Sequence, residues 1–115
     1  VYYNSHNSWG CHNNIDKKII KELAMTTGDI RDYECVKSSM KNCNLIYNLA
    51  SLIGIPYSYK APSSYIDTNI RGIMNIMNAS KHQNIKKIIH TSTSEVYGSA
   101  KYIPIDENHH MLQVK

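Results

Sequence analysis

The chain has 115 residues, which leaves room for one domain of ordinary size and no more. Hydrophobic residues make up 42% and charged residues 19%, with no collagen-like period, so a disordered or fibrous chain is excluded. The net charge is +4, but 11 of the 13 basic residues are lysines scattered along the chain. Because nucleic-acid-binding modules gather their charge on one face and favour arginine, the hypothesis of a basic nucleic-acid-binding domain rests on the net charge alone.

Three cysteines, Cys11, Cys35 and Cys43, form an odd set without a C-x-x-C pair. We therefore expect reduced thiols and a cytoplasmic protein. No apolar run approaches the roughly 20 residues of a membrane span, and no signal peptide opens the chain. The six histidines show no i, i+4 pair and no acidic cluster of the metal-site type. We predict no metal site and expect the histidines at the surface.

The first quarter of the chain predicts a strand, a helix and a second strand. Residues 1–3 are β-branched and aromatic, as at the end of a strand, and lead into a polar loop over 4–14. Apolar residues recur at helical spacing over 15–24, opposite a face of lysine and glutamate. Residues 25–28 fit a brief strand.

A second helix and a third strand follow. Asp32 is placed to cap the helix, which ends at residues 42–44. Residues 45–49 are a short apolar run of strand type. Small and turn-forming residues over 50–62 then indicate a loop at the end of that strand.

The second half predicts one long helix and a fourth strand. The helix runs from about residue 63 to 83, and four apolar side chains of its predicted buried face are spaced by 4, 3 and 4 residues: Ile66, Ile70, Ile73 and Met77. Residues 85–90 form the strand, which is followed by a hydroxyl-rich stretch and a turn at Gly98. This alternation predicts an α/β fold, a partial Rossmann-type parallel sheet with right-handed crossovers and helices on both faces.

The segment after the fourth strand is the main candidate site. It holds four hydroxyls and a carboxylate: Thr91, Ser92, Thr93, Ser94 and Glu95. Because strand ends hold side chains rigidly, such a segment suits acid-base chemistry. A Ser/Thr-rich turn, with Glu95 as a solvated acid in a first helical turn, is the alternative.

Three other segments each allow two interpretations. Asp29 follows a predicted strand and fits either a ligand amine or a plain helix-capping loop. The small residues at 48–51 allow either a close approach to a ligand or a tight turn. Asn69 lies one position off the apolar face of the long helix, where its amide can bond across to the sheet or face solvent.

Together these segments resemble the extended short-chain dehydrogenase/reductase superfamily, in particular its NAD-dependent epimerase/dehydratase family, which acts on nucleotide sugars. Four motifs carry the resemblance, in family order and at family spacing: residues 28–32, 48–51, 67–72 and 91–98. The resemblance implies a Rossmann-type domain, of which residues 1–115 would be a central fragment lacking the first strand with its Gly-rich loop and the C-terminal part with the Tyr-x-x-x-Lys pair.

The resemblance also implies cofactor-binding residues. Asp29 and Ile30 would hold the adenine, and the loop after the third strand would line the cofactor with Leu49, Ala50 and Ser51. Asn69, on the long helix, would support the strand beneath the nicotinamide, and Thr91 would lie beside the nicotinamide. The cofactor would be NAD or NADP. In this family an acid at the end of the second strand usually selects NAD, and the strand over residues 1–3 takes that place here. No acid follows it closely, which favours NADP, and Asn4, Ser5 and Asn7 would then bind the phosphate.

The implied catalytic residues are Thr93, Ser94 and Glu95. Thr93 would bond the sugar oxygen that is oxidised, and Glu95 would abstract the C5 proton that the C4 ketone acidifies. Dehydratases often carry Asp at the position of Ser94. The branch resembling GDP-mannose dehydratases carries Ser there, as this chain does.

The expected activity is therefore that of an NAD(P)-dependent nucleotide-sugar 4,6-dehydratase, forming a homodimer as the full-length protein, with the fragment alone inactive. The alternatives are a 4-epimerase or decarboxylase of the same family, or a non-catalytic dinucleotide-binding protein.

Overall fold

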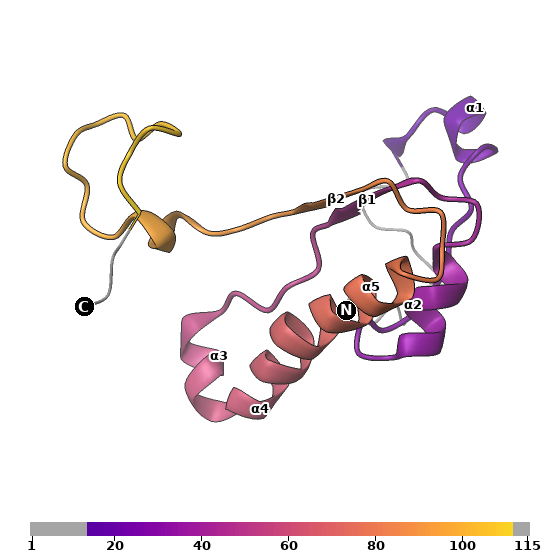
Figure 1. Ribbon diagram of the computed structural model, residues 1–115, viewed down its shortest axis with the longest axis horizontal. Helices are drawn as coiled ribbons and strands as arrows, with labels where there is room; N and C mark the ends of the chain where they lie inside the picture. Colours follow the sequence, from indigo (N-terminus) through magenta and orange to yellow (C-terminus); the bar gives the residue numbers. More distant parts are fainter. Residues whose placement is uncertain (1–13, 112–115) are drawn as a thin grey trace.

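The computed structural model describes residues 14–111 of the chain (Figure 1). Its elements follow in chain order: α1 (Lys17–Ile20), α2 (Tyr33–Ser39), β1 (Leu45–Asn48), α3 (Ile55–Lys60), α4 (Pro62–Tyr65), the π-helix η2 (Ile66–Arg71), α5 (Gly72–Ser80), β2 (Lys87–His90) and the 3-10 helix η3 (Ser94–Tyr97). The predicted strand at residues 1–3 and the candidate phosphate-binding residues near Asn4 lie outside the described residues. No helix among residues 14–111 is long and apolar enough to cross a membrane.

The two strands pair in parallel, as the sequence predicts. Leu45 is opposite Lys87 and Asn48 is opposite His90, and the chain between them forms the helical crossover α3 to α5. Backbone hydrogen bonds continue past both ends of the ladder, since the N–H of Lys86 donates to Asn44 and that of Thr91 donates to Asn48. The prediction of a loop over residues 50–62 needs correction, because this segment contains α3. A proline lies in the first turn of α3, where proline favours the start of a helix.

The N-terminal expectations are wrong in two places. The helix expected over 15–24 is only α1, four residues long. Ile19 and Leu23 are 54% and 43% exposed, so the apolar face of that segment has little to pack against, and tertiary packing is what sustains most helices. Residues 25–28 form no strand, because a strand needs a hydrogen-bonded neighbour and none stands beside them among the described residues.

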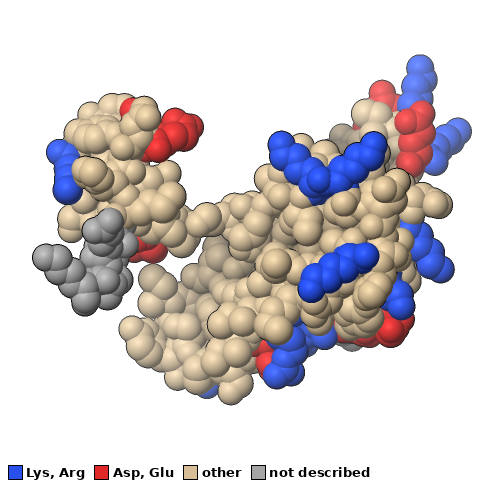
Figure 2. Space-filling model, viewed as in Figure 1, with Lys and Arg blue, Asp and Glu red and all other residues tan. Residues whose placement is uncertain are grey.

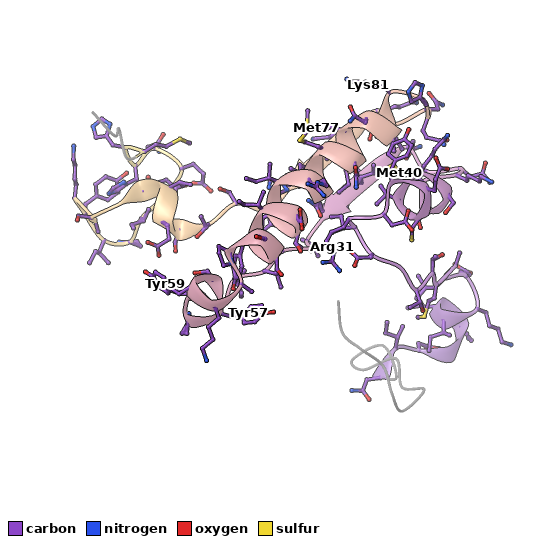
Figure 3. The ribbon with its side chains drawn as sticks, turned by 90° about the horizontal axis from the view of Figure 1, so that it is seen from below. Arg31, Met40, Tyr57, Tyr59, Met77 and Lys81 are labelled. Carbon is purple, nitrogen blue, oxygen red and sulfur yellow. The ribbon has the colours of Figure 1, made fainter. Side chains whose placement is uncertain are left out.

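The long helix forms as a continuous run from α4 through η2 to α5, but its buried face differs from the predicted one. Ile66, Ile70 and Met77 are 55%, 55% and 54% exposed, and only Ile73 of the predicted four is half-buried. The π-helical turn of η2 is wider than an α-helical turn, so it shifts the phase of every side chain around it. Figure 3 shows Met77 on the other side of α5 from Met40.

The core lies where α2, α5 and the strands meet. Met40, Ile76 and Ala79 are buried, with half-buried apolar side chains around them: Ile30, Tyr33, Val36, Ile46, Ile73, Ile85 and Ile88. α5 approaches the loop after residue 28 at Gly72, where a Cβ would lie 2.9 Å from Ile30 Cγ2. A larger residue at this crossing would therefore force the Ile30 side chain to move.

Residues 94–111 form a lobe set apart from the helices (Figure 1). His109 is the buried residue of this lobe, with 4% of its surface exposed. The expectation that the histidines lie at the surface is wrong for His109, because the rings of Tyr97 and Tyr102 cover it.

Candidate active site

The end of β2 leads directly into the hydroxyl-rich segment. Thr93 is the N-cap of η3: its side-chain oxygen accepts a hydrogen bond from the N–H of Glu95 at 3.3 Å. The helix ends at Gly98, which has a φ of 63°, a conformation that glycine adopts at little cost. Thr93, Ser94 and Glu95 are exposed, as is Thr91 before them. The structure thus brings these three predicted catalytic residues into one turn at the carboxyl end of β2.

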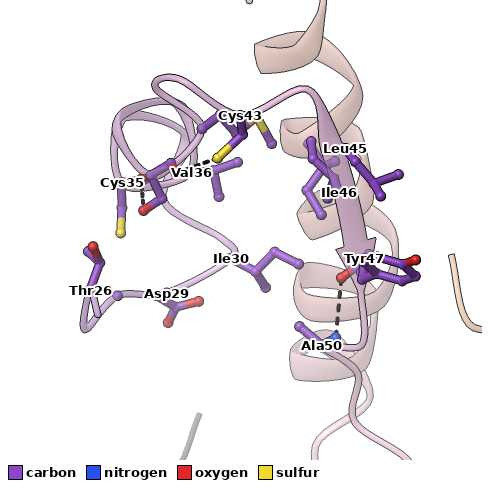
Figure 4. Close-up of a pocket in the computed structure, with 15 residues that line it drawn as sticks. Thr26, Asp29, Ile30, Cys35, Val36, Cys43, Leu45, Ile46, Tyr47 and Ala50 are labelled. Atoms are coloured by element: carbon purple, nitrogen blue, oxygen red, sulfur yellow. Dashed lines mark hydrogen bonds between the residues drawn. The ribbon is translucent and has the colours of Figure 1, made fainter. Parts of the chain in front are cut away.

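A pocket of about 370 Å³ lies between residues 26–30, α2 and β1 (Figure 4). Three of the predicted cofactor-binding residues line it: Asp29, Ile30 and Ala50. They come from the loop before α2 and the loop after β1, so the fold brings together two segments that the sequence separates. Leu49, Ser51, Asn69 and Thr91 lie outside this pocket.

Asp29 carries a fixed negative charge at this pocket. The guanidinium of Arg31 donates to both carboxylate oxygens, with Nη2 2.6 Å from Oδ2 and Nε 3.0 Å from Oδ1. These bonds, together with one from the backbone N–H of Arg31, lower the pKa of Asp29 below its usual value. Asp29 is therefore ionised at neutral pH and can accept further hydrogen bonds.

We expect the Asp29–Arg31 pair to give the chain a small pH-dependent stability. A carboxyl whose pKa is lower in the folded chain stabilises it above the unfolded-chain value of about 3.9, and the contribution disappears as the pH falls through the lower folded pKa. Asp29→Asn should have a lower urea midpoint than the wild type at pH 7, with the gap closing below about pH 4. Glu107→Gln, at an exposed position, is the control, and an equal gap at all pH values would contradict the expectation.

Asn69 binds the loop after β1 rather than the strand itself. Its Oδ1 accepts the N–H of Leu52 at 2.9 Å, and its Nδ2 donates to the Leu52 carbonyl at 2.9 Å. The hydroxyl of Ser51 also donates to Oδ1, at 3.1 Å. The amide therefore pairs with Leu52 as a second peptide group would, and it fixes the path of residues 51–52.

Asn48, within the predicted segment 48–51, and Asn75, which the sequence did not single out, support the loops that carry Ala50 and Asp29. Asn48 is 5% exposed; its Nδ2 lies 3.0 Å from His90 Nδ1, and its Oδ1 accepts the N–H of Ala50 at 3.2 Å. Asn75, on α5, donates to the carbonyls of Ile30 and Arg31 at 3.0 and 2.9 Å. Asn75 thus holds the chain next to Asp29. The bond of Asn48 to His90 and the bonds of Asn75 join residues far apart in the sequence, so no local pattern reveals them.

Basic side chains are spread over the face shown in Figure 2 and do not gather into one patch there. This distribution gives no support to the nucleic-acid-binding alternative.

The family model described as GDP-mannose 4,6 dehydratase matches residues 1–113. The chain belongs to the GDP-mannose 4,6-dehydratase family. This finding confirms the resemblance to nucleotide-sugar epimerases and dehydratases and, with it, the Rossmann-type fold.

Two curated relatives are each similar to part of the chain. The chain is 47% identical over 55 residues to Protein CapI of Staphylococcus aureus, covering 48% of the chain and 16% of that protein. It is 37% identical over 82 residues to a UDP-glucose 4-epimerase of Lacticaseibacillus casei, covering 70% and 25%.

Among solved structures, a UDP-N-acetylglucosamine 4-epimerase from Methanobrevibacter ruminantium matches with a TM-score of 0.70 and 29% identity, covering 92% of the chain and 34% of the epimerase. The chain thus spans a quarter or less of the two curated relatives and a third of this structure.

Proposed function

We propose that the chain is the central part of a longer enzyme, an NAD(P)-dependent nucleotide-sugar 4,6-dehydratase. The observation that carries the proposal is the position of the Glu95 carboxylate. Glu95 is exposed, and its N–H donates to the Thr93 side chain in the cap of η3, so the two residues lie together. A 4-epimerase moves hydride at C4 and needs no base for the C5 proton. A dehydratase needs such a base, because it removes that proton.

The residues of the pocket fit a dinucleotide. An ionised carboxylate at Asp29 can accept hydrogen bonds from an adenine amine, and the apolar side chain of Ile30 and the small Ala50 leave room for a flat ring. A pocket of about 370 Å³ lies within the size range of ligand sites. Leu49, Ser51 and Thr91 would continue the site toward the end of β2, and Asn69 would act on it through the loop at Leu52.

The nicotinamide, when bound, supplies a reversible acceptor for the hydride at C4 of the sugar. The Thr93 hydroxyl would hold the C4 oxygen in place. The Glu95 carboxylate would remove the C5 proton, which the adjacent C4 ketone makes acidic, and hydroxide would leave from C6. The C5 proton and the hydroxide together make the water released, and the proton of the C4 hydroxyl goes to the solvent. The hydride would then return from the nicotinamide to C6, and C5 would take a proton from the solvent. Ser94 offers a hydroxyl beside these groups.

We also propose that the full-length enzyme is a homodimer and works in the cytoplasm. Exposed apolar side chains follow one face of the long helix: Ile66, Ile70, Met74 and Met77, each between 54% and 55% exposed. A second copy is the partner that would cover such a stripe in a nucleotide-sugar enzyme. Cys35 and Cys43 are free thiols, as in a reducing compartment.

The experiment is to incubate the full-length protein and NAD or NADP with UDP-, GDP- and dTDP-sugars and to weigh the products by mass spectrometry. Loss of one water supports the dehydratase. The second candidate function is a 4-epimerase, favoured by the similarity to the Lacticaseibacillus casei and Methanobrevibacter ruminantium epimerases. It would leave the mass unchanged and invert the C4 hydroxyl. No turnover of any sugar would favour a non-catalytic dinucleotide-binding protein.

A further inference from the structure

His109 is held in the lobe of residues 94–111 by both of its ring nitrogens. The N–H of Lys101 donates to Nε2 at 3.0 Å, and Nδ1 lies 2.9 Å from the carbonyl oxygen of His110. A carbonyl only accepts and a backbone N–H only donates, so the proton must be on Nδ1 and Nε2 must carry a free lone pair. The ring fits this lobe in the neutral form alone.

The ring of His109 also connects the lobe to the candidate active site. It meets Tyr97 edge-on, with ring centroids 5.6 Å apart and planes at 84°. Tyr97 is the last residue of η3, the one-turn helix that carries Glu95. The ring of Tyr102 lies on another side of His109, with centroids 4.8 Å apart.

Asp106 closes the lobe around the same ring. It accepts the Tyr102 hydroxyl at 2.6 Å and the N–H of Asn108 at 2.9 Å, and its carbonyl accepts the N–H of His109 at 3.1 Å. The bond from Tyr102, followed by that from Asn108, lowers the pKa of Asp106, so this carboxylate is ionised at neutral pH. Among the described residues, the titratable side chains that face His109 are Asp106, Tyr97 and Tyr102.

We propose that neutral His109 is a positioning residue for the active site: through Tyr97 it holds η3, and so Glu95, at the end of β2. This inference rests on the proposed function of Glu95. η3 is a single turn in the lobe that stands apart from the helices, and the packing of Tyr97 on His109 restrains it in addition to its own cap (Figure 1).

The test measures kcat and KM of the full-length enzyme and of its variants. His109→Leu removes the acceptor, and we expect kcat to fall by about tenfold or more with KM changed less than about threefold, because orientation rather than binding is lost. His109→Gln keeps an oxygen acceptor for the N–H of Lys101, so kcat should recover to within about threefold of the wild type.

The matched controls are His82→Leu and His82→Gln, at an exposed histidine on the turn after α5, and both should behave as the wild type. A kcat within twofold of the wild type in His109→Leu, or equal losses of kcat in His109→Leu and His109→Gln, would each overturn the proposal. Glu95→Gln is measured in parallel, since full activity of that variant contradicts the proposed function, while the two His109 variants still report on the positioning of η3.

Discussion

Replacing Glu95 with glutamine in the full-length protein is expected to slow water loss from the nucleotide sugar by about 10² to 10⁴-fold, the usual contribution of a positioned general base. Glutamine has nearly the same shape and can still accept a hydrogen bond, but it cannot take a proton from C5. The backbone N–H of Glu95 still bonds to Thr93 in the variant, so η3 should form as before. KM should change little, because the carboxylate acts on the transition state.

Glu107→Gln is the matched control for this prediction. Glu107 is an exposed glutamate in the same lobe, and its loss removes the same charge without touching η3. We expect the rate of the control to stay within about twofold of the wild type. Equal rates for the two variants, measured as product formed per unit time, would show that Glu95 is not the base.

Replacing Asn69 with leucine is expected to destabilise the chain by about 2 kcal/mol. The variant leaves the N–H of Leu52 without its partner and leaves the Leu52 carbonyl only the Ser51 hydroxyl at 3.3 Å, and an unsatisfied buried polar group costs about 1 to 3 kcal/mol. Leu52 is half-buried, so water can recover part of that loss for each group. The measurement is the free energy of unfolding from urea denaturation, which also reports a change in slope if the loop after β1 loosens.

Asn78→Leu controls for the change of an asparagine to leucine on the same helix, because Asn78 is exposed on α5. It should change the free energy of unfolding by less than about 0.5 kcal/mol. Asn69→Asp adds a second comparison: it keeps the acceptor for the Leu52 N–H but replaces the donor to the Leu52 carbonyl, so we expect an intermediate loss or one as large as that of leucine. Equal stability of Asn69→Leu and Asn78→Leu would contradict the account of the loop.

The elements that could be predicted are those whose signal is local. The strands at β1 and β2 are short runs of apolar residues, and Asp32 caps α2 as expected, accepting from the N–H groups of Glu34 and Cys35. The strand expected at 25–28 depended on a partner strand, which no local pattern specifies. The buried face of the long helix was placed wrongly because η2 widens one turn, and spacing rules assume 3.6 residues per turn.

The candidate site also combines features with a local sequence signal and features that only the fold shows. The grouping of Thr93 and Glu95 follows from one strand end and one helix cap, both visible in the sequence. The bond of Asn48 to His90 joins residues 42 apart, and that of Asn75 to Ile30 joins residues 45 apart, so only the fold shows them. The burial of His109 depends on two tyrosines that meet in the lobe. Its neighbour His110 is exposed, so composition cannot tell the two histidines apart.

In the proposed reaction, this family member removes water from a nucleotide sugar by taking a proton from C5. Its most direct test is the mass spectrum of the product that the full-length protein forms in heavy water. We expect a product that has lost one water and carries one deuterium at C5, because C5 takes its new hydrogen from the solvent. A product that keeps the mass of the substrate and has an inverted C4 hydroxyl would contradict it.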